Sequence, residues 1–262
     1  MEPTDVKERI AELLRNRAGT AGHHLDPYDT SRFEAILREL GSPPASVLDV
    51  GCGTGVATDV ASSLGFDAVG VDTDAEAMAV MEAPQHVASV VALPFGDSTF
   101  DIVLASEVLE HLPAPIFGQA LAELSRVGAQ SVVLTVPNSE SLESASTRCP
   151  KCFCIYSIHG HVRRFKRQDM ADLLPNFRLA AIREIGPYKL RHRSIEWFFR
   201  RRLLGRWPAA PGTVCPQCHA RQRSIRRTDG VAQTSRVRRA AMFLAGYPWH
   251  RWWLLARYER IT

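Results

Sequence analysis

The chain has 262 residues, of which 45% are hydrophobic and 23% are charged. This length excludes two independent full-size domains and fits one large α/β domain or one domain with a sizeable insertion, while the composition excludes a disordered chain. The net charge of +4 hides an asymmetry, because residues 183–262 carry 18 Arg and Lys against four acidic residues and the rest of the chain is acidic.

The basic last third indicates a polyanion or a membrane surface as a partner, although an arginine-rich composition spread over solvated helices would give the same count. The longest apolar runs, such as 131–136, are far shorter than the ~18 to 20 residues needed to cross a bilayer, so we expect no transmembrane helix. The N-terminus has neither a basic start nor an apolar stretch, and no secretory signal is readable. A cytoplasmic protein is therefore expected.

Taken in chain order, the hydrophobic pattern first predicts two helices, at 6–17 and 30–40, joined by a polar loop. After residues 41–44 it changes to short apolar runs that alternate with helical stretches. We predict buried strands at 47–50, 68–71, 86–91, 102–105 and 131–136, and helices at 55–64, 74–82 and 114–126. This alternation is typical of a doubly wound parallel sheet, so the expected fold class is α/β and Rossmann-like.

The regular alternation ends after residue 136. A polar loop rich in Cys and His at 138–165 is followed by a predicted helix at 168–174 and by strands at 178–185 and 252–259, which complete a seven-stranded sheet. The basic segment between the last two strands is interpreted as an insertion. The predicted organisation is an N-terminal helical lid at 1–44, a Rossmann-like core at 45–186, a basic insertion at 187–245 and a final core strand within 246–262.

A glycine loop ends the first predicted strand and opens a helix. Gly51, Gly53 and Gly55 permit a tight turn with positive φ and let a ligand approach the backbone. The loop lacks the Lys-Ser/Thr pair of a phosphate-binding P-loop, and Asp49 precedes it instead. Because a carboxylate repels pyrophosphate but can hold an ammonium group, the loop indicates a ligand with an amino-acid moiety rather than a dinucleotide.

The string from residue 47 to residue 55 resembles motif I of class I S-adenosylmethionine (SAM)-dependent methyltransferases. In order and spacing, segments 71–72, 92–101 and 107–112 resemble later motifs of the same family. Segments 136–138 and 160–165 resemble those of its ubiquinone-biosynthesis-like small-molecule methyltransferases. The resemblance covers roughly residues 45–185. It implies that 45–186 is a SAM-binding core.

The resemblance also implies which residues hold the cofactor. Asp72 would accept both ribose hydroxyls and Asp97 would lie near the adenine amine, although taken alone Asp72 also fits a helix cap and Asp97 a turn cap. The implied cofactor-binding residues are Asp49, Gly51, Cys52, Gly53, Thr54, Gly55, Asp72, Thr73, Ala92, Leu93, Asp97 and Ser106.

Methyl transfer from a sulfonium is an in-line displacement, so the protein aligns the acceptor and removes a proton where the acceptor needs it. His111 is the leading candidate base because it follows the fourth strand, and Glu107 is the second. The same Glu-His-Leu pattern occurs in relatives with unrelated acceptors, so a shared packing or cofactor-holding role is the alternative. The residues predicted to face the acceptor are His24, Tyr28, Asn138 and His161.

Five of the six cysteines lie in two groups. Cys149 with Cys152, and Cys215 with Cys218, form two Cys-Pro-x-Cys knuckles, a spacing that lets two thiolates share one tetrahedral Zn²⁺. Since 62 residues separate the knuckles, the site must be assembled in space. A closed shell of four thiolates predicts a structural zinc, with unligated thiols or two disulfides as alternatives. Possible substitute ligands are Cys154, His159, His161 and His219.

These features predict a SAM-dependent methyltransferase (EC 2.1.1.-) that O-methylates a small-molecule or sugar/glycan acceptor, with the zinc-bearing insertion shaping the acceptor site. One alternative is an RNA-directed methyltransferase whose basic segment grips phosphates. Another is a lipid-linked substrate reached by peripheral membrane contact, because aromatic and basic residues mix at 197–202 and 247–253. The arginines of the RNA interpretation are Arg191, Arg193, Arg200, Arg201, Arg202, Arg221, Arg223, Arg226 and Arg227.

Overall fold

The computed structural model of the chain describes residues 3–17, 29–190, 207, 213–222 and 249–261. The chain folds into two compact units. Unit 1 comprises Met1–Asn138, Phe165–Pro187 and Arg251–Thr262, and unit 2 comprises Ser139–Arg164 and Tyr188–His250. None of the helices within the described ranges is long and apolar enough to cross a membrane.

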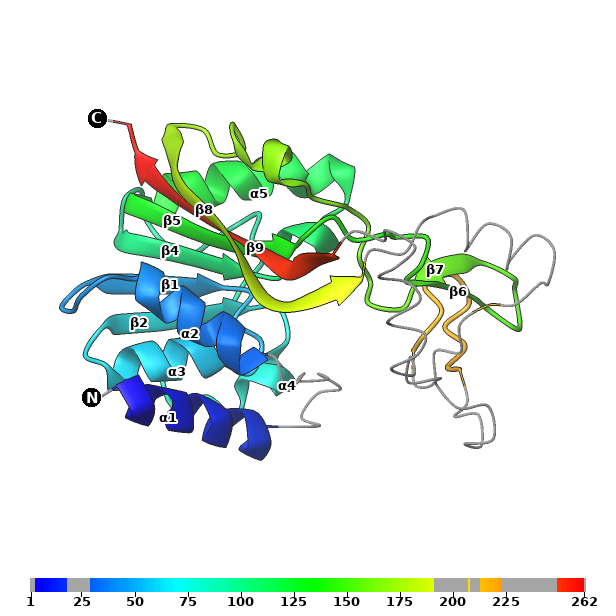
Figure 1. Cartoon of the computed structure of the whole chain (residues 1–262), viewed down its shortest axis with the longest axis horizontal. Coiled ribbons are helices and arrows are strands. Elements are labelled where there is room, and N and C mark those ends of the chain that lie inside the picture. Colours follow the sequence, from blue (N-terminus) through cyan, green and yellow to red (C-terminus); the bar gives the residue numbers. More distant parts are fainter. Residues whose placement is uncertain (1–2, 18–28, 191–206, 208–212, 223–248, 262) are drawn as a thin grey trace. The chain divides into compact units, whose positions relative to one another are not determined.

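Unit 1 is built on a seven-stranded sheet with the order β3-β2-β1-β4-β5-β9-β8 (Figure 1). Strands β1 to β5 run parallel, and β9 is antiparallel to β5. The strands are β1 Ser46–Val50, β2 Asp67–Asp72, β3 Gln85–Val87, β4 Phe100–Ser106, β5 Gly128–Pro137, β8 Phe177–Leu190 and β9 Trp249–Arg260. The predicted Rossmann-like α/β fold with a seven-stranded sheet is confirmed. The strand order reverses between β1 and β4, where doubly wound sheets bind their ligands at the carboxyl ends of the strands.

Helices cover both faces of the sheet. They are α1 Pro3–Asn16, α2 Asp29–Glu39, α3 Val56–Ser63, α4 Ala75–Met78 and α5 Ala114–Val127, with 3-10 turns at Leu109–His111 and Arg167–Met170. On one face Leu104 of β4 is buried with Ile10 and Ile36, whereas on the other Val103 is buried with Leu124 of α5. Neighbouring residues of one strand thus enter opposite cores, as expected for a sheet covered on both sides.

Two predicted elements are shorter than expected. The strand expected at 86–91 is only Gln85–Val87, and all three of its residues are exposed. It lies at the sheet edge, and the chain then turns so that Ala92 donates its main-chain N–H to the Ser89 carbonyl. The helix expected at 74–82 ends at Met78. The main-chain N–H groups of the two residues at 82 and 83 are instead taken by the carboxylate of Asp59.

Two further expectations about the second half of the chain are wrong. The helix expected at 168–174 is a single 3-10 turn, Arg167–Met170, in which Met170 is fully buried. The loop expected at 138–165 contains a two-stranded hairpin, β6 Ser146–Arg148 and β7 Ile155–Ser157, which belongs to unit 2. Three-residue strands are too short to produce a readable hydrophobic period.

Candidate active site and metal centre

The glycine loop follows β1 at the carboxyl end of the central strands. Gly51, Gly53 and Gly55 have φ angles of 73°, 54° and 72°, a region that other residues rarely adopt. A Cβ added at Gly51 would lie 2.4 Å from Val108, and one added at Gly55 would lie 2.3 Å from Met81. At Gly51 and Gly55, conformation and close packing therefore both require glycine.

Asp72, the last residue of β2, is held by two main-chain donors. Its Oδ2 accepts from the N–H of Gly53 at 2.9 Å, and its Oδ1 accepts from the N–H of Asp74 at 3.0 Å. The cap of α4 is Asp74, whose side chain accepts from the first turn of that helix. The structure therefore gives the capping role to Asp74, and the Asp72 carboxylate instead bridges β2 and the glycine loop.

Asp49 is buried beneath the loop. Its Oδ2 accepts from Thr58 Oγ1 at 2.7 Å, and burial, partly opposed by this hydrogen bond, raises the pKa of Asp49 to about 6. Cys52 is half-buried with its Sγ 3.6 Å from the sulfur of Met81, and burial raises the pKa of its thiol. Cys52 is thus a neutral packing residue at neutral pH, and Thr54 beside it is buried.

The raised pKa of Asp49 makes the stability of the ligand-free protein depend on pH. The pKa of an Asp in the unfolded chain is near 3.8, so between about pH 4 and 6 the folded state binds more protons and the free energy of unfolding falls as pH rises. The expected loss is about 3 kcal/mol. Urea unfolding at a series of pH values measures this loss in the free energy of unfolding. Asp49→Asn keeps an acceptor for Thr58 and should remove this decline; an equal slope in both proteins would contradict the assignment.

A buried ion pair ties the end of α1 to the glycine loop. Arg17 donates to the carbonyl of Thr54 at 2.6 Å and pairs with Asp59 at 2.5 Å. The two charged side chains are only 4% and 0% exposed. Sequence reasoning missed this contact, because a single Arg at the end of an amphipathic helix ordinarily faces solvent.

The two candidate bases lie at the carboxyl end of β4, on the same sheet edge as the glycine loop. Glu107 has a positive φ of 58°, and its carboxylate accepts from Trp253 Nε1 at 3.0 Å and lies 4.0 Å from the guanidinium of Arg32. His111 is exposed on the following 3-10 turn. Glu110 between them is fully buried, and burial together with the charge of Glu107 raises its pKa, which favours the neutral acid.

The remaining residues expected at the cofactor site differ in their burial and in their side-chain partners. Leu93 is buried, and Ser106 Oγ lies 2.8 Å from the hydroxyl of Thr135. Asp97 is exposed, and its carboxylate pairs with Arg126 at 3.0 Å. The exposed residues of this set also include Thr73 and Ala92.

The residues expected to face the acceptor belong to different parts of the chain. Asn138 is buried in unit 1, where its side-chain amide donates to the carbonyl of Arg251 at 3.1 Å and so fastens β5 to β9. His161 lies in unit 2, where its Nδ1 hydrogen-bonds the carboxylate of Glu140. His24 and Tyr28 lie outside the described residues, as do all the arginines of the RNA interpretation except Arg221.

The two cysteine knuckles of unit 2 share one backbone geometry. Phe153 donates its N–H to the carbonyl of Cys149 at 3.0 Å, and His219 donates to Cys215 at 2.9 Å. Each first cysteine in turn donates its N–H to the carbonyl five residues on, at 2.8 and 3.0 Å. Phe153 and His219, each directly after the second cysteine of its knuckle, both have positive φ angles, 61° and 55°. The knuckles are thus two copies of one turn.

The four knuckle sulfurs converge on one point. Cys149 Sγ lies 3.6 Å from Cys218 Sγ, Cys152 Sγ lies 3.5 Å from Cys215 Sγ, and all four atoms lie within 4.8 Å of one another. Zn–S bonds of about 2.3 Å in a tetrahedron require sulfurs about 3.8 Å apart, so the donor set fits zinc. All six cysteines are free thiols in the structure, which does not contain the alternative pair of disulfides. Neither Cys154 nor a histidine belongs to the group.

Comparison with known proteins agrees with the fold. Residues 48–136 match a sequence family described as a methyltransferase domain. The chain is 34% identical over 137 residues to an uncharacterized methyltransferase of Mycobacterium tuberculosis strain H37Rv, covering 44% of this chain and 54% of that protein. It is 29% identical over 155 residues to the ubiquinone biosynthesis O-methyltransferase of Hahella chejuensis, covering 53% and 57%. The chain thus spans little more than half the length of these relatives.

Solved structures share the fold at low sequence identity. A 1,6-didemethyltoxoflavin-N1-methyltransferase from Burkholderia thailandensis, solved with its substrate and S-adenosylhomocysteine, has a TM-score of 0.50 at 16% identity, over 88% of this chain and 77% of that one. A SAM-dependent methyltransferase from Methanosarcina mazei has a TM-score of 0.50 at 15% identity, over 91% and 99%. Residues 48–136 are therefore similar to a methyltransferase domain, and the seven-stranded sheet has the fold of these solved methyltransferases.

Proposed function

We propose that the protein is a SAM-dependent methyltransferase that transfers a methyl group to a hydroxyl of a small-molecule or glycan acceptor. The observation that carries the proposal is the Asp72 carboxylate, clamped across the glycine loop at the edge where doubly wound sheets bind ligands. Each of its oxygens uses one lone pair on the main chain and keeps one for a ribose hydroxyl. The family match at residues 48–136 supports the same chemistry.

Other residues of unit 1 complete the cofactor site in this proposal. Asp49, once ionised, holds the ammonium of the amino-acid moiety, and the glycine loop admits the cofactor against the backbone. When bound, SAM supplies an electrophilic methyl group on its sulfonium. The chain's own tasks are to orient the acceptor oxygen and to take its proton.

His111 is proposed to take that proton, with Glu107 as the alternative. His111→Gln is expected to lower kcat about 100-fold or more while the affinity for SAM stays unchanged, because a positioned base contributes roughly 10²- to 10⁴-fold. Glu107→Gln serves as the matched comparison at the same sheet edge. If His111→Gln keeps full kcat and Glu107→Gln loses it, Glu107 is the base; if SAM affinity falls with His111→Gln, its role is to hold the cofactor.

Acceptor selection is proposed to reside in unit 2, stabilised by a structural zinc on Cys149, Cys152, Cys215 and Cys218. Unit 2 contains a cavity of about 580 Å³ lined by the hairpin and the second knuckle, including Tyr156, His161 and Thr213. Concave sites of this size are typical of small-molecule recognition. An RNA acceptor, and a lipid-linked acceptor at a membrane surface, are the competing proposals, supported by the basic composition of residues 183–262.

Labelling with tritiated SAM tests the function and separates these acceptors. The protein is incubated with fractionated cell extract, and the label is expected in the small-molecule or polysaccharide fraction. Label that nuclease removes would favour RNA, and label in the lipid extract would favour the membrane-linked acceptor. If no fraction is labelled and S-adenosylhomocysteine does not bind in calorimetry, the proposed activity is wrong.

A further inference from the structure

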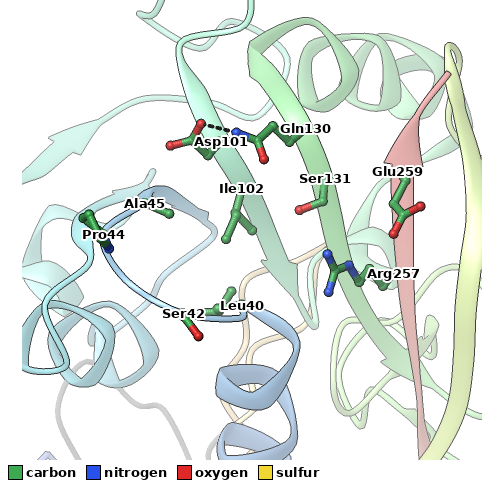
Figure 2. Close-up of a pocket in the computed structure, with 10 residues that line it drawn as sticks. All are labelled: Leu40, Ser42, Pro44, Ala45, Asp101, Ile102, Gln130, Ser131, Arg257 and Glu259. Carbon is green, nitrogen blue, oxygen red and sulfur yellow. Dashed lines mark hydrogen bonds between the residues drawn. The ribbon is translucent and has the colours of Figure 1, made fainter. Parts of the chain in front are cut away.

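A cavity of about 500 Å³ lies within unit 1, at the sheet edge opposite the glycine loop (Figure 2). Asp101 and Ile102 line it from the start of β4, Ser131 from the start of β5 and Arg257 from the end of antiparallel β9. These positions are the amino ends of the parallel strands. At about 3.3 Å per residue, the strand from Ile102 to Glu107 places the two edges roughly 16 Å apart. The proposed methyl-transfer site does not use this cavity.

Arg257 brings to the cavity a guanidinium whose hydrogen-bonding capacity is almost unused. Its Nη1 donates to the carbonyl of Glu39 at a long 3.4 Å, and its Nε is buried without an acceptor. Within the described ranges no carboxylate lies within 4.0 Å of this guanidinium. A guanidinium offers five N–H donors in a fork that matches carboxylate and phosphate oxygens. Its guanidinium, which Figure 2 shows at the cavity, therefore offers preformed donors for an anion.

Ser131 provides a second unused polar group. Its residue is only 4% exposed, and its hydroxyl makes no hydrogen bond to any part of the chain that the structure describes. Figure 2 shows this hydroxyl and the Arg257 guanidinium directed into the same space between β4 and β9. Arg257 Nε is buried without an acceptor and the Ser131 hydroxyl is open to the cavity, so both side chains keep polar groups that a ligand in this cavity can use.

The carboxylates of the cavity wall are already occupied. Asp101 accepts from the N–H and hydroxyl of Ser46 at 2.9 and 2.8 Å and from Gln130 Nε2 at 2.6 Å (Figure 2). Glu259 pairs with Arg178 at 2.6 Å. Asp101 thus stays ionised with its oxygens held by neutral donors, whereas the charge of Glu259 is paired with Arg178, and neither carboxylate pairs with Arg257.

The opposite wall is apolar. Leu40 and Ile102 are 4% and 6% exposed, and Pro44 and Ala45 continue this surface. A ligand that satisfies both walls carries an anionic group at one end and an apolar body at the other. The cavity volume is within the range of sites for small organic molecules.

We propose that this cavity is a second ligand site, which binds a small organic anion, a carboxylate or a phosphate monoester, through Arg257 and Ser131. The apolar part of the ligand packs against Leu40 and Ile102. Since the site lies at the far edge of the sheet from the glycine loop, its ligand takes no part in methyl transfer.

Titration of the full chain with benzoate and with phenyl phosphate, followed by NMR chemical shifts or calorimetry, tests the site. At least one probe is expected to bind with a Kd below about 10 mM, and the neutral analogue benzyl alcohol more weakly. The probe that binds with the lower Kd identifies the anionic group of the ligand as a carboxylate or a phosphate. Arg257→Gln should weaken binding about tenfold or more, and Ser131→Ala about threefold, because the hydroxyl contributes one neutral hydrogen bond.

Arg38→Gln is the matched control, since Arg38 lies on α2 with a side chain 75% exposed and does not line the cavity. Its probe affinity should equal that of the wild type. The site is refuted if neither anion binds below about 10 mM, or if both Arg257→Gln and Ser131→Ala bind like wild type. Ser131→Ala removes a hydroxyl without a partner, so it should fold even if Arg257→Gln does not. Unchanged S-adenosylhomocysteine binding in these variants keeps this result separate from the test of methyl transfer.

Discussion

Cys149→Ser is expected to abolish metal binding and to unfold unit 2 while leaving the seven-stranded sheet of unit 1 folded. Among the described residues, the buried cluster of unit 2 consists of Cys149, Tyr156 and Cys215, so two of its three members are proposed ligands. A core this small cannot offset the entropy of ordering the chain. Structural zinc contributes on the order of 10 kcal/mol to the folding free energy of such units. Loss of the zinc is therefore expected to unfold unit 2.

Metal analysis and limited proteolysis measure this effect. The wild type should hold about one zinc per chain, as a four-thiolate site binds one ion. The variant should hold almost none and be cut within residues 139–164 and 188–250. Cys154→Ser is the matched control, because its sulfur lies outside the four-sulfur group, and it should keep both the zinc and the protease resistance. A zinc-free wild type with an unchanged cleavage pattern would contradict the metal centre.

The sequence contained enough local information to predict the main parts of the sheet edge at the glycine loop. The apolar run of β1, the three glycines and Asp72 lie within 27 residues of one another, and each has a direct physical requirement in the structure: burial, positive φ and a clamped carboxylate. The knuckle spacing similarly indicated that four sulfurs would meet. It did not indicate that the two knuckles are copies of one turn, because that similarity lies in main-chain bonds rather than in residue types.

Contacts between distant parts of the chain could not be predicted in this way. Trp253 donates to Glu107 across 146 residues, and Arg17 reaches Asp59 across 42. Periodicity reports which face of an element is buried, but not which polar group of another element it will meet. The end of α4 shows the same limit, since the helical pattern continued to residue 82 while the Asp59 carboxylate took the main-chain donors there.

Asp72→Ala is expected to weaken binding of SAM and S-adenosylhomocysteine about 100-fold or more. In the proposed site two ribose hydroxyls donate to this carboxylate. Each such charge-assisted hydrogen bond contributes roughly 1.5 kcal/mol or more, and the loss of both corresponds to a factor of at least about 100. Removing the carboxylate also deprives the N–H groups of Gly53 and Asp74 of their acceptor, so the loop loses its preorganisation. Calorimetric titration with S-adenosylhomocysteine measures the change without an acceptor.

Asp67→Ala is the matched control, because Asp67 is exposed at the start of β2, at the opposite end of that strand from Asp72. It should change the affinity by less than about threefold, as surface substitutions away from a site have small effects. Asp72→Asn tests more specifically whether both oxygens of residue 72 must accept hydrogen bonds. Both oxygens of Asp72 accept from main-chain N–H groups, so either orientation of an amide sets an NH₂ group against a donor. The amide should therefore bind the cofactor far more weakly than the wild type, and unchanged affinity in Asp72→Asn would show that Asp72 does not hold the cofactor.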